Sequence, residues 1–302
     1  MEDTKKELQK ILGTECCLFE ESMAKHTTFQ TGGNADLFLM PKTIQELQQS
    51  IACLQKYHIS YEIVGNGSNL LVGDGGIRGA VVQLYRNMQQ VTVNDTMMTI
   101  QCGALLSMVA AKAAEAGLSG MAFASGIPGT FGGAVVMNAG AYGGEMKDIL
   151  VSVDVLTKDL EVVTLTPKDL DLGYRHSNIL ENGYIVLGGT IKLQKGDKQT
   201  ILDQMAELAK QRREKQPLQY PSAGSTFKRP EGHFAGKLIS DAGLKGKQIG
   251  GAAVSEKHAG FIINVGNATT KDILDLMAFC QKEVMTQFGV LLEPEVKFLG
   301  QI

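Results

Sequence analysis

The 302-residue sequence lacks several features that would assign a protein class at once. No apolar run approaches the roughly 18 residues that a membrane span needs, so we expect no membrane span. The first residues, MEDTKKELQK, are charged and contain no apolar core, which predicts no secretory signal and a cytoplasmic location. The five cysteines include no CxxC spacing, so we expect reduced thiols and no metal site.

Two nucleotide-binding fingerprints are also missing. GxGxxG fails because Leu70 stands where the third glycine should be, and GxxxxGK[ST] fails around residues 236–237 and 246–247. A simple Rossmann or P-loop fold is therefore disfavoured. The net charge of −3 argues against a general nucleic-acid surface, so an anionic ligand would have to be held by a few local cations and backbone N–H groups.

Glycine is what the sequence has in excess, with 35 residues gathered in separate loops between apolar runs. Two loops, GNGSN at 65–69 and SGIPGT at 125–130, have the composition of a pyrophosphate site. Without Cβ atoms the main chain can approach a ligand, and consecutive N–H groups can form an anion-binding nest. Either loop alone could equally be a tight turn in a compact fold, but the shared composition of the two favours ligand binding.

Apolar spacing and turn residues predict a mixed α+β chain. In the first two-thirds we expect a helix over 43–58 with a Thr43–Glu46 capping box, strands at 61–64, 80–84 and 184–193, hairpins at 90–102 and 152–165, a helix over 105–116, a long loop at 125–145 and a short helix from Thr166. After a polar boundary at 194–200 we expect an amphipathic helix at 201–213, short strands and turns over 217–266, a helix over 270–288 and a strand-like tail. The last helix carries a stripe predicted to lie in the core: Ile273, Met277, Cys280, Val284 and Phe288.

Five segments in chain order resemble those of the UDP-N-acetylenolpyruvoylglucosamine reductases, the flavin reductases of bacterial peptidoglycan precursor synthesis. They are VGNGSNLLV, GLSGMAFASGIPGTFGGAVVMNAGAYGGE, GYRHS, SAGSTFKRP and LEPEV, and the resemblance spans roughly residues 25–302. It implies the shorter subtype of the family, with an FAD-binding domain of the vanillyl-alcohol oxidase (PCMH) type and a smaller α+β substrate domain. The expected ranges are 1–195, in two lobes split near 80, and 200–302 with the C-terminal strand returning to the active site.

The resemblance assigns FAD to the two glycine loops. The FAD-binding residues that it implies are Gly65, Asn66, Gly67, Ser68, Asn69, Leu70, Ser125, Gly126, Ile127, Pro128, Gly129, Thr130 and Gly133.

Three further residues have a catalytic and a structural interpretation. Ser225 could be a turn serine, Arg175 a surface ion-pair partner and Glu295 an edge-strand carboxylate. The resemblance instead makes them the catalytic serine, arginine and glutamate, gathered at the cofactor. It implies a reaction in two halves: reduction of FAD by NADPH, then hydride transfer to C3 of an enolpyruvyl ether. Arg175 and a protonated Glu295 would stabilise the enolate-like charge, and Ser225 would protonate C2.

The substrate diphosphate needs cations, and the basic helix end LAKQRREKQP offers several. Lys215 matches a family lysine that contacts the diphosphate, although a solvated charged face would look the same. Lys228 and Arg229 are further candidates. Tyr142 could cover substrate or flavin, but the family tyrosine with that role comes from an extra loop that this chain lacks. His258 is a lone histidine, for which a structural role is the default.

Two other functions remain open on the residues alone. A flavin oxidase of the same fold, acting on an alcohol or lactone, would explain the glycine loops but not the catalytic trio. A non-catalytic nucleotide-binding module would explain the loops and the cations.

Overall fold

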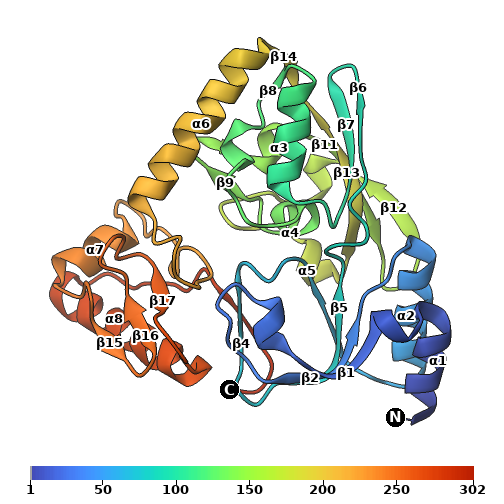
Figure 1. Ribbon diagram of the computed structural model, residues 1–302, viewed down its shortest axis with the longest axis horizontal. Coiled ribbons are helices and arrows are strands. Elements are labelled where there is room, and N and C mark those ends of the chain that lie inside the picture. The colour runs from blue at the N-terminus through green and yellow to red at the C-terminus, as the bar shows by residue number, and fades with distance from the viewer. Residues whose placement is uncertain (1) are drawn as a thin grey trace. The chain divides into compact units, whose positions relative to one another are not determined.

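The computed structural model describes residues 2–302. The chain forms two compact units, each built from separate stretches (Figure 1). Unit 1 contains Met1–Leu18, Leu37–Asn66 and Ala80–Gln211, and unit 2 contains Phe19–Asp36, Gly67–Gly79 and Arg212–Ile302. Unit 2 therefore takes two short stretches from the N-terminal third in addition to the C-terminal third. The predicted functional division near 195–200 stays a prediction.

The helices are α1 (Glu2–Leu12), α2 (Ile44–Lys56), α3 (Leu106–Glu115), α4 (Phe131–Val136), α5 (Ile179–Asn182), α6 (Lys198–Lys215), α7 (Ala235–Asp241) and α8 (Thr270–Phe288). Single 3₁₀ turns are η1 (Thr14–Cys16), η2 (Met23–His26), η3 (Ala122–Ala124), η4 (Met146–Asp148) and η5 (Pro167–Asp169). The strands are β1 (Cys17–Ser22), β2 (Asn34–Leu39), β3 (Tyr61–Val64), β4 (Leu70–Val72), β5 (Ile77–Gln83), β6 (Val91–Asn94), β7 (Met97–Gln101), β8 (Leu118–Ser119), β9 (Gly140–Ala141), β10 (Gly144–Glu145), β11 (Leu150–Leu156), β12 (Val162–Leu165), β13 (Ile185–Lys192), β14 (Gln194–Lys195), β15 (Gln248–Ile249), β16 (Ala252–Val254), β17 (Ile262–Asn264) and β18 (Lys297–Leu299).

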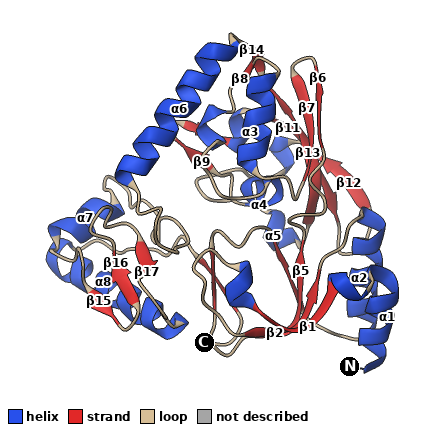
Figure 2. Cartoon of the chain, in the orientation of Figure 1, coloured by secondary structure: helices blue, strands red, loops and turns tan. Residues whose placement is uncertain are grey.

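Unit 1 is built around a five-stranded sheet in the order β12-β11-β13-β7-β6, with antiparallel neighbours (Figure 2). Both predicted hairpins are confirmed as β6–β7 and β11–β12. The helix predicted over 105–116 is α3, and Gly117, which follows its C-cap residue, has the left-handed φ of +66° that favours glycine. A four-stranded sheet has the order β1-β2-β5-β3, and β3 runs parallel to the later part of β5. The bounds of the two units fall within β1, β2 and β5, so this sheet is not assigned to unit 1 alone.

The segment 125–145, predicted to be a long loop, contains the short helix α4 and the small hairpin β9–β10. The loop prediction was wrong because two glycines in the helix hide its propensity. Tertiary contacts supply what propensity lacks. The Thr130 hydroxyl accepts a hydrogen bond from the Gly133 N–H, while the N–H groups of Phe131 and Gly132 bond to the carbonyls of Ala104 and Cys102 at 2.8 Å each.

Unit 2 has its core around α8, which the sequence predicted with the same bounds. Thr269 and Asp272 form a capping box at its start, and Gly289 ends it with φ +67°. Four residues of the predicted stripe are buried, but Phe288 is 40% exposed, so its assignment to the core was wrong. The three-stranded sheet β15-β16-β17 packs against α8, and β18 runs parallel to β4.

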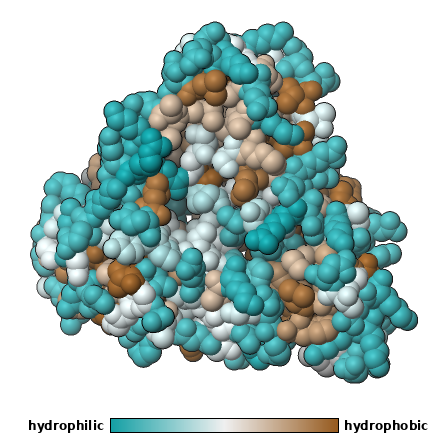
Figure 3. All heavy atoms as spheres, viewed as in Figure 1, coloured by the Kyte–Doolittle hydropathy of each residue, from teal (hydrophilic) through white to brown (hydrophobic). Residues whose placement is uncertain are grey.

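Two predictions after the polar boundary need correction. Helix α6 begins at Lys198, and Ile201 is its one buried residue, so it is a solvated helix rather than an amphipathic one. Figure 3 shows mostly hydrophilic residues along it. The segment 217–266 also contains a helix, α7, which its glycine and polar composition concealed.

The cysteines of the described chain are unpaired and buried. Cys53 and Cys280 are 2% and 0% exposed, which confirms the core assignment of Cys280. Burial raises the pKa of the Cys102 and Cys280 thiols to about 12, so they stay protonated at neutral pH. No helix within residues 2–302 is long and apolar enough to cross a membrane.

Candidate functional site

In unit 1 the start of the first glycine loop lies against the second loop. The Asn66 side-chain amide donates a 2.7 Å hydrogen bond to the Pro128 carbonyl. A Cβ atom on Gly65 would lie 2.5 Å from the Thr130 hydroxyl, so this approach requires glycine. The Gln83 side chain also donates to the Gly65 carbonyl at 3.3 Å. Two segments about 60 residues apart in sequence are thus joined in one cradle.

The cradle has the chemistry of an anion site. Within residues 2–302, the amide N–H groups of Asn66, Gly126 and Gly129 make no hydrogen bond. Other groups of the same loop are held in place: the Ser125 hydroxyl bonds to the Ala122 carbonyl at 2.8 Å, and the Ile127 N–H bonds to the Ala124 carbonyl at 3.0 Å. A rigid loop with unpartnered amides suits a phosphate group, so these residues fit a dinucleotide cofactor.

The rest of the first loop, from Gly67, belongs to unit 2. Gly67 has φ +65°, and a Cβ there would lie 2.0 Å from the His26 carbonyl oxygen, so the position accepts only glycine. The Gly67 carbonyl accepts a 3.2 Å bond from the Thr28 N–H. Asn69 directly precedes β4, and its side-chain amide donates a 3.2 Å hydrogen bond to the Glu295 carbonyl. This half of the predicted cofactor loop is therefore bonded to a predicted catalytic residue.

Ser225 and Glu295 lie on neighbouring extended segments of unit 2. The Glu295 N–H donates to the carbonyl of Thr226, the residue after Ser225, at 2.8 Å. The Lys228 N–H donates to the Glu293 carbonyl at 2.8 Å, so the two segments run antiparallel. Ser225 is exposed and follows Gly224, whose φ of +76° turns the chain. Glu295 is half-buried. Two of the three predicted catalytic residues are thus brought together.

Arg175, the third predicted catalytic residue, lies in unit 1 on a tight turn. Gly173 and His176 exchange two backbone hydrogen bonds, of 3.1 and 3.3 Å, and Arg175 has φ +54°. Its guanidinium donates to the Gly140 carbonyl at 3.2 Å and lies 5.0 Å from the centre of the Tyr174 ring. Arg175 is therefore attached to the β9–β10 hairpin. Its meeting with the other two residues stays a prediction.

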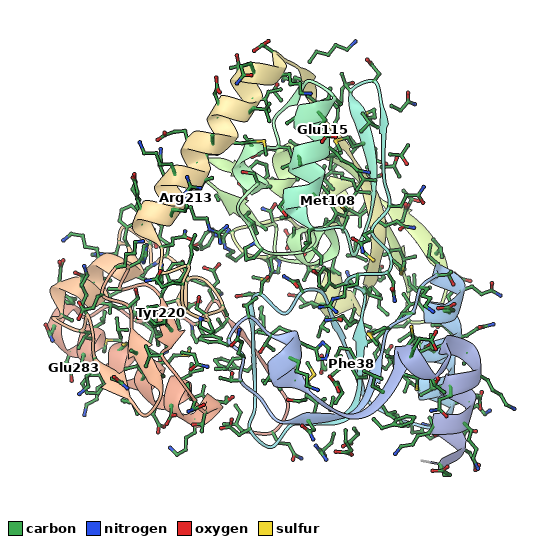
Figure 4. All side chains as sticks on the ribbon, in the orientation of Figure 1. Phe38, Met108, Glu115, Arg213, Tyr220 and Glu283 are labelled. Atoms are coloured by element: carbon green, nitrogen blue, oxygen red, sulfur yellow. The ribbon has the colours of Figure 1, made fainter. Side chains whose placement is uncertain are left out.

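The cation candidates belong to unit 2. Lys215 is the exposed last residue of α6, in a basic final turn that also contains Arg213, labelled in Figure 4. Lys228 forms a 3.2 Å ion pair with Glu293. The Arg229 guanidinium lies 4.0 Å from the centre of the Phe234 ring. Lys228 and Arg229 directly follow the Ser225 segment, whereas Lys215 comes from a different element.

Tyr142 and His258 have clear local environments. Tyr142 has φ +51° and is 49% exposed at the turn of the β9–β10 hairpin. In the same hairpin, the Gly140 carbonyl accepts the hydrogen bond from the Arg175 guanidinium. The His258 ring accepts a 3.1 Å hydrogen bond from the Gly260 N–H at Nδ1 and lies edge-on to Phe261. Burial lowers the pKa of His258, with a smaller contribution from Lys245. A neutral, packed imidazole supports the structural interpretation.

Sequence reasoning missed two residues at these sites. The buried Asn138 bonds to Gly173 of the Arg175 turn, and the buried Thr226 hydroxyl accepts a 3.0 Å bond from the Ile262 N–H beside Ser225. The one available signal for Asn138 was an asparagine directly after an apolar helical run, a position that favours left-handed backbone. Nothing in the local sequence marks Thr226.

Two family descriptions match the chain. An FAD-binding domain family matches residues 35–166, which include both glycine loops and α4. The C-terminal domain family of UDP-N-acetylenolpyruvoylglucosamine reductase matches residues 216–299, which include Ser225 and Glu295. The chain is also 52% identical, over 296 residues and 94% of each chain, to the UDP-N-acetylenolpyruvoylglucosamine reductase of Agathobacter rectalis.

Solved structures show the same relationship. The crystal structure of UDP-N-acetylenolpyruvylglucosamine reductase from Thermus caldophilus matches with a TM-score of 0.79 and 37% identity, over 94% of this chain and 98% of that one. The 4-ethylphenol oxidase of Gulosibacter chungangensis matches with a TM-score of 0.51 and 16% identity, over 64% of this chain and 42% of that one. The second likeness shows a shared fold alone, which agrees with the predicted α+β FAD-binding architecture.

Proposed function

Because the chain belongs to the UDP-N-acetylenolpyruvoylglucosamine reductase family, we propose that it reduces the enolpyruvyl double bond of UDP-N-acetylglucosamine enolpyruvate to give UDP-N-acetylmuramate. The reaction serves peptidoglycan precursor synthesis, uses NADPH as reductant and takes place in the cytoplasm. The observation that carries the proposal is 52% identity across 94% of both chains. Local geometry supports it, because segments that bear predicted catalytic and cofactor residues are hydrogen-bonded to each other.

The proposed cofactor is FAD. The cradle residues Asn66, Gly126 and Gly129 would hold its pyrophosphate through their amide N–H groups, with Gly65 and Gly67 keeping the main chain close. When bound, FAD supplies the hydride chemistry at C3 of the enolpyruvyl group.

The chain's own residues would stabilise the negative charge that develops on the substrate and would supply the proton. Negative charge builds on the substrate carboxylate during reduction, and Arg175 would bind it with two parallel N–H donors. Glu295, in its protonated form, would donate a further hydrogen bond. Ser225 would deliver a proton to C2. The hydrogen bond from the Glu295 N–H to the Thr226 carbonyl supports a shared task for Ser225 and Glu295, since it fixes the spacing of their segments.

The substrate's diphosphate would be met by cations of unit 2. Lys215, Lys228 and Arg229 are the candidates, and each is at least partly exposed. A lysine acts as a point charge, whereas an arginine can pair with phosphate oxygens bidentately. Tyr142, on the hairpin that binds the Arg175 guanidinium, would cover the bound substrate or flavin.

A visible absorption spectrum tests flavin, reductant and acceptor in one cuvette. We expect a flavin spectrum in the purified or FAD-reconstituted protein, bleaching on addition of NADPH, and recovery of the oxidised spectrum when the enolpyruvyl substrate follows under anaerobic conditions. Protein that never takes up flavin would refute the proposal in favour of a non-catalytic module. Rapid oxygen consumption with an alcohol, and no recovery with the enolpyruvyl substrate, would favour an oxidase.

Ser225→Ala tests the proton donor. Flavin reduction by NADPH should survive, while reoxidation by the substrate should slow by about 10²-fold or more, in line with a lost general acid. Ser222→Ala is the matched control, because Ser222 lies in the same segment and is held through its carbonyl by the Thr28 hydroxyl at 2.6 Å. Equal reoxidation rates in the wild type and Ser225→Ala would remove Ser225 from the mechanism.

A further inference from the structure

We propose that Asn138 is a positioning residue for Arg175, acting through the turn that carries the arginine. The inference rests on the proposed function, in which Arg175 stabilises the charge that develops on the substrate. It concerns contacts within unit 1 alone.

Asn138 occupies a backbone position that few residues accept. It follows the C-cap of α4, is 0% exposed and has φ +40°. Left-handed backbone costs most residues about 1–2 kcal/mol, and asparagine is among the few that tolerate it. The backbone is anchored on both sides, because the Asn138 N–H bonds to the Val135 carbonyl and the Ala139 N–H to the Ala134 carbonyl. The side chain is therefore projected in a fixed direction.

The side-chain amide of Asn138 joins three segments. Its NH₂ group donates to the Gly173 carbonyl at 2.9 Å and to Glu145 Oε2 at 2.7 Å. Its carbonyl oxygen accepts from the Lys147 N–H at 2.9 Å. Two oxygen partners on one side and an N–H partner on the other permit a single orientation of the amide. The side chain is fully buried and both its NH₂ group and its oxygen have protein partners, so Asn138 acts through these partners rather than on a ligand.

One partner of the Asn138 amide closes the turn that carries Arg175, and the residue that binds the Arg175 guanidinium lies close to Asn138 in the sequence. Gly173 closes the turn with His176, and this turn sets the backbone of Arg175. The guanidinium at the other end donates to the carbonyl of Gly140, two residues after Asn138. An arginine that binds a carboxylate bidentately needs a fixed plane as well as a charge. Loss of the Asn138 amide would free the turn while leaving the charge in place.

The test compares Asn138→Gly with Asn87→Ala. Glycine keeps the φ of +40° without strain, so Asn138→Gly removes the side-chain bonds without straining the backbone. Asn87 is the matched control, since its side-chain amide also donates 2.9 Å to a backbone carbonyl of unit 1, that of Met40. In Asn138→Gly, we expect flavin reduction by NADPH to stay within about twofold and substrate reduction to slow by about tenfold or more. Asn87→Ala should alter neither half-reaction by more than about twofold.

A double-mutant cycle separates positioning from general loosening. If Asn138 acts through Arg175, adding Asn138→Gly to Arg175→Ala should slow substrate reduction by less than about twofold further. Additive losses would overturn the proposal, as would unchanged substrate reduction in Asn138→Gly alone.

Hydrogen–deuterium exchange gives a readout that needs no turnover. The amides of Gly173 and His176 should exchange about tenfold faster or more in Asn138→Gly, and at the wild-type rate in Asn87→Ala. Unchanged exchange would overturn the positioning role. A wild-type protein without reductase activity would instead refute the proposed function, and the exchange rates would still decide whether Asn138 holds the turn.

Discussion

The amide N–H of Glu295 donates a 2.8 Å hydrogen bond to the carbonyl oxygen of Thr226. This bond joins the two segments that carry the predicted proton donor and one of the predicted charge stabilisers, 69 residues apart. The Thr226 side chain is fixed as well, because its hydroxyl accepts from the Ile262 N–H at 3.0 Å and is fully buried. Thr226 is therefore one buried residue through which unit 2 holds the Ser225 segment.

Thr226→Val should weaken unit 2 and slow substrate reduction. Valine has nearly the same shape but leaves the buried Ile262 N–H without an acceptor, which costs about 1–3 kcal/mol in the free energy of unfolding. Urea unfolding measures that loss, and stopped-flow reoxidation measures the effect on the Ser225 segment. Thr226→Ser keeps the hydroxyl and should retain most of the stability. Equal stability of the valine and serine variants would show that the Ile262 bond contributes little.

Gly133→Ala should separate stability from cofactor binding. Gly133 is exposed on α4, and the nearest atom to an added Cβ is the Thr130 hydroxyl oxygen at 3.5 Å, an ordinary contact. Alanine in a helix is favoured over glycine by about 0.5–1 kcal/mol, so the flavin-free protein should become more stable. If FAD lies against this glycine, the methyl group should raise the FAD dissociation constant by about tenfold or more.

Calorimetric unfolding of the flavin-free protein and fluorescence titration with FAD measure these two effects. The rise in stability serves as the internal control, since it shows that the fold accepts the methyl group. A dissociation constant equal to that of the wild type would remove Gly133 from the cofactor-binding residues.

His258 should make stability fall on mild acidification. Burial lowers its pKa in the folded protein, so the unfolded chain takes up the proton first as the pH drops below about 6.5. The contribution of His258 to stability is therefore intact above that pH and declines below it, until the folded form also becomes protonated. Urea unfolding between pH 8 and pH 5 should show this decline in the wild type. His258→Gln should flatten that part of the profile, and an identical slope in the variant would assign the decline to other groups.

Much of the local structure was predictable. The hairpins β6–β7 and β11–β12 follow from alternating apolar residues around a turn, and the bounds of α8 follow from its apolar stripe. Helix α4 was not predictable, because two glycines depress its propensity and its first N–H groups are satisfied by Ala104 and Cys102, about 30 residues away. The solvated face of α6 was missed because apolar spacing alone does not reveal whether another element covers it.

The sequence by itself determined the family, the positions of the glycine loops and the identity of the candidate residues, since all of these are written in ordered local motifs. Only the tertiary structure decided that Asn66 meets Pro128, that Glu295 pairs with Thr226, and that Asn138 holds the turn of Arg175. Each of these bonds joins segments whose approach is set by the packing of buried faces against one another. The local sequence of each segment carries no signal that predicts which distant segment it will approach.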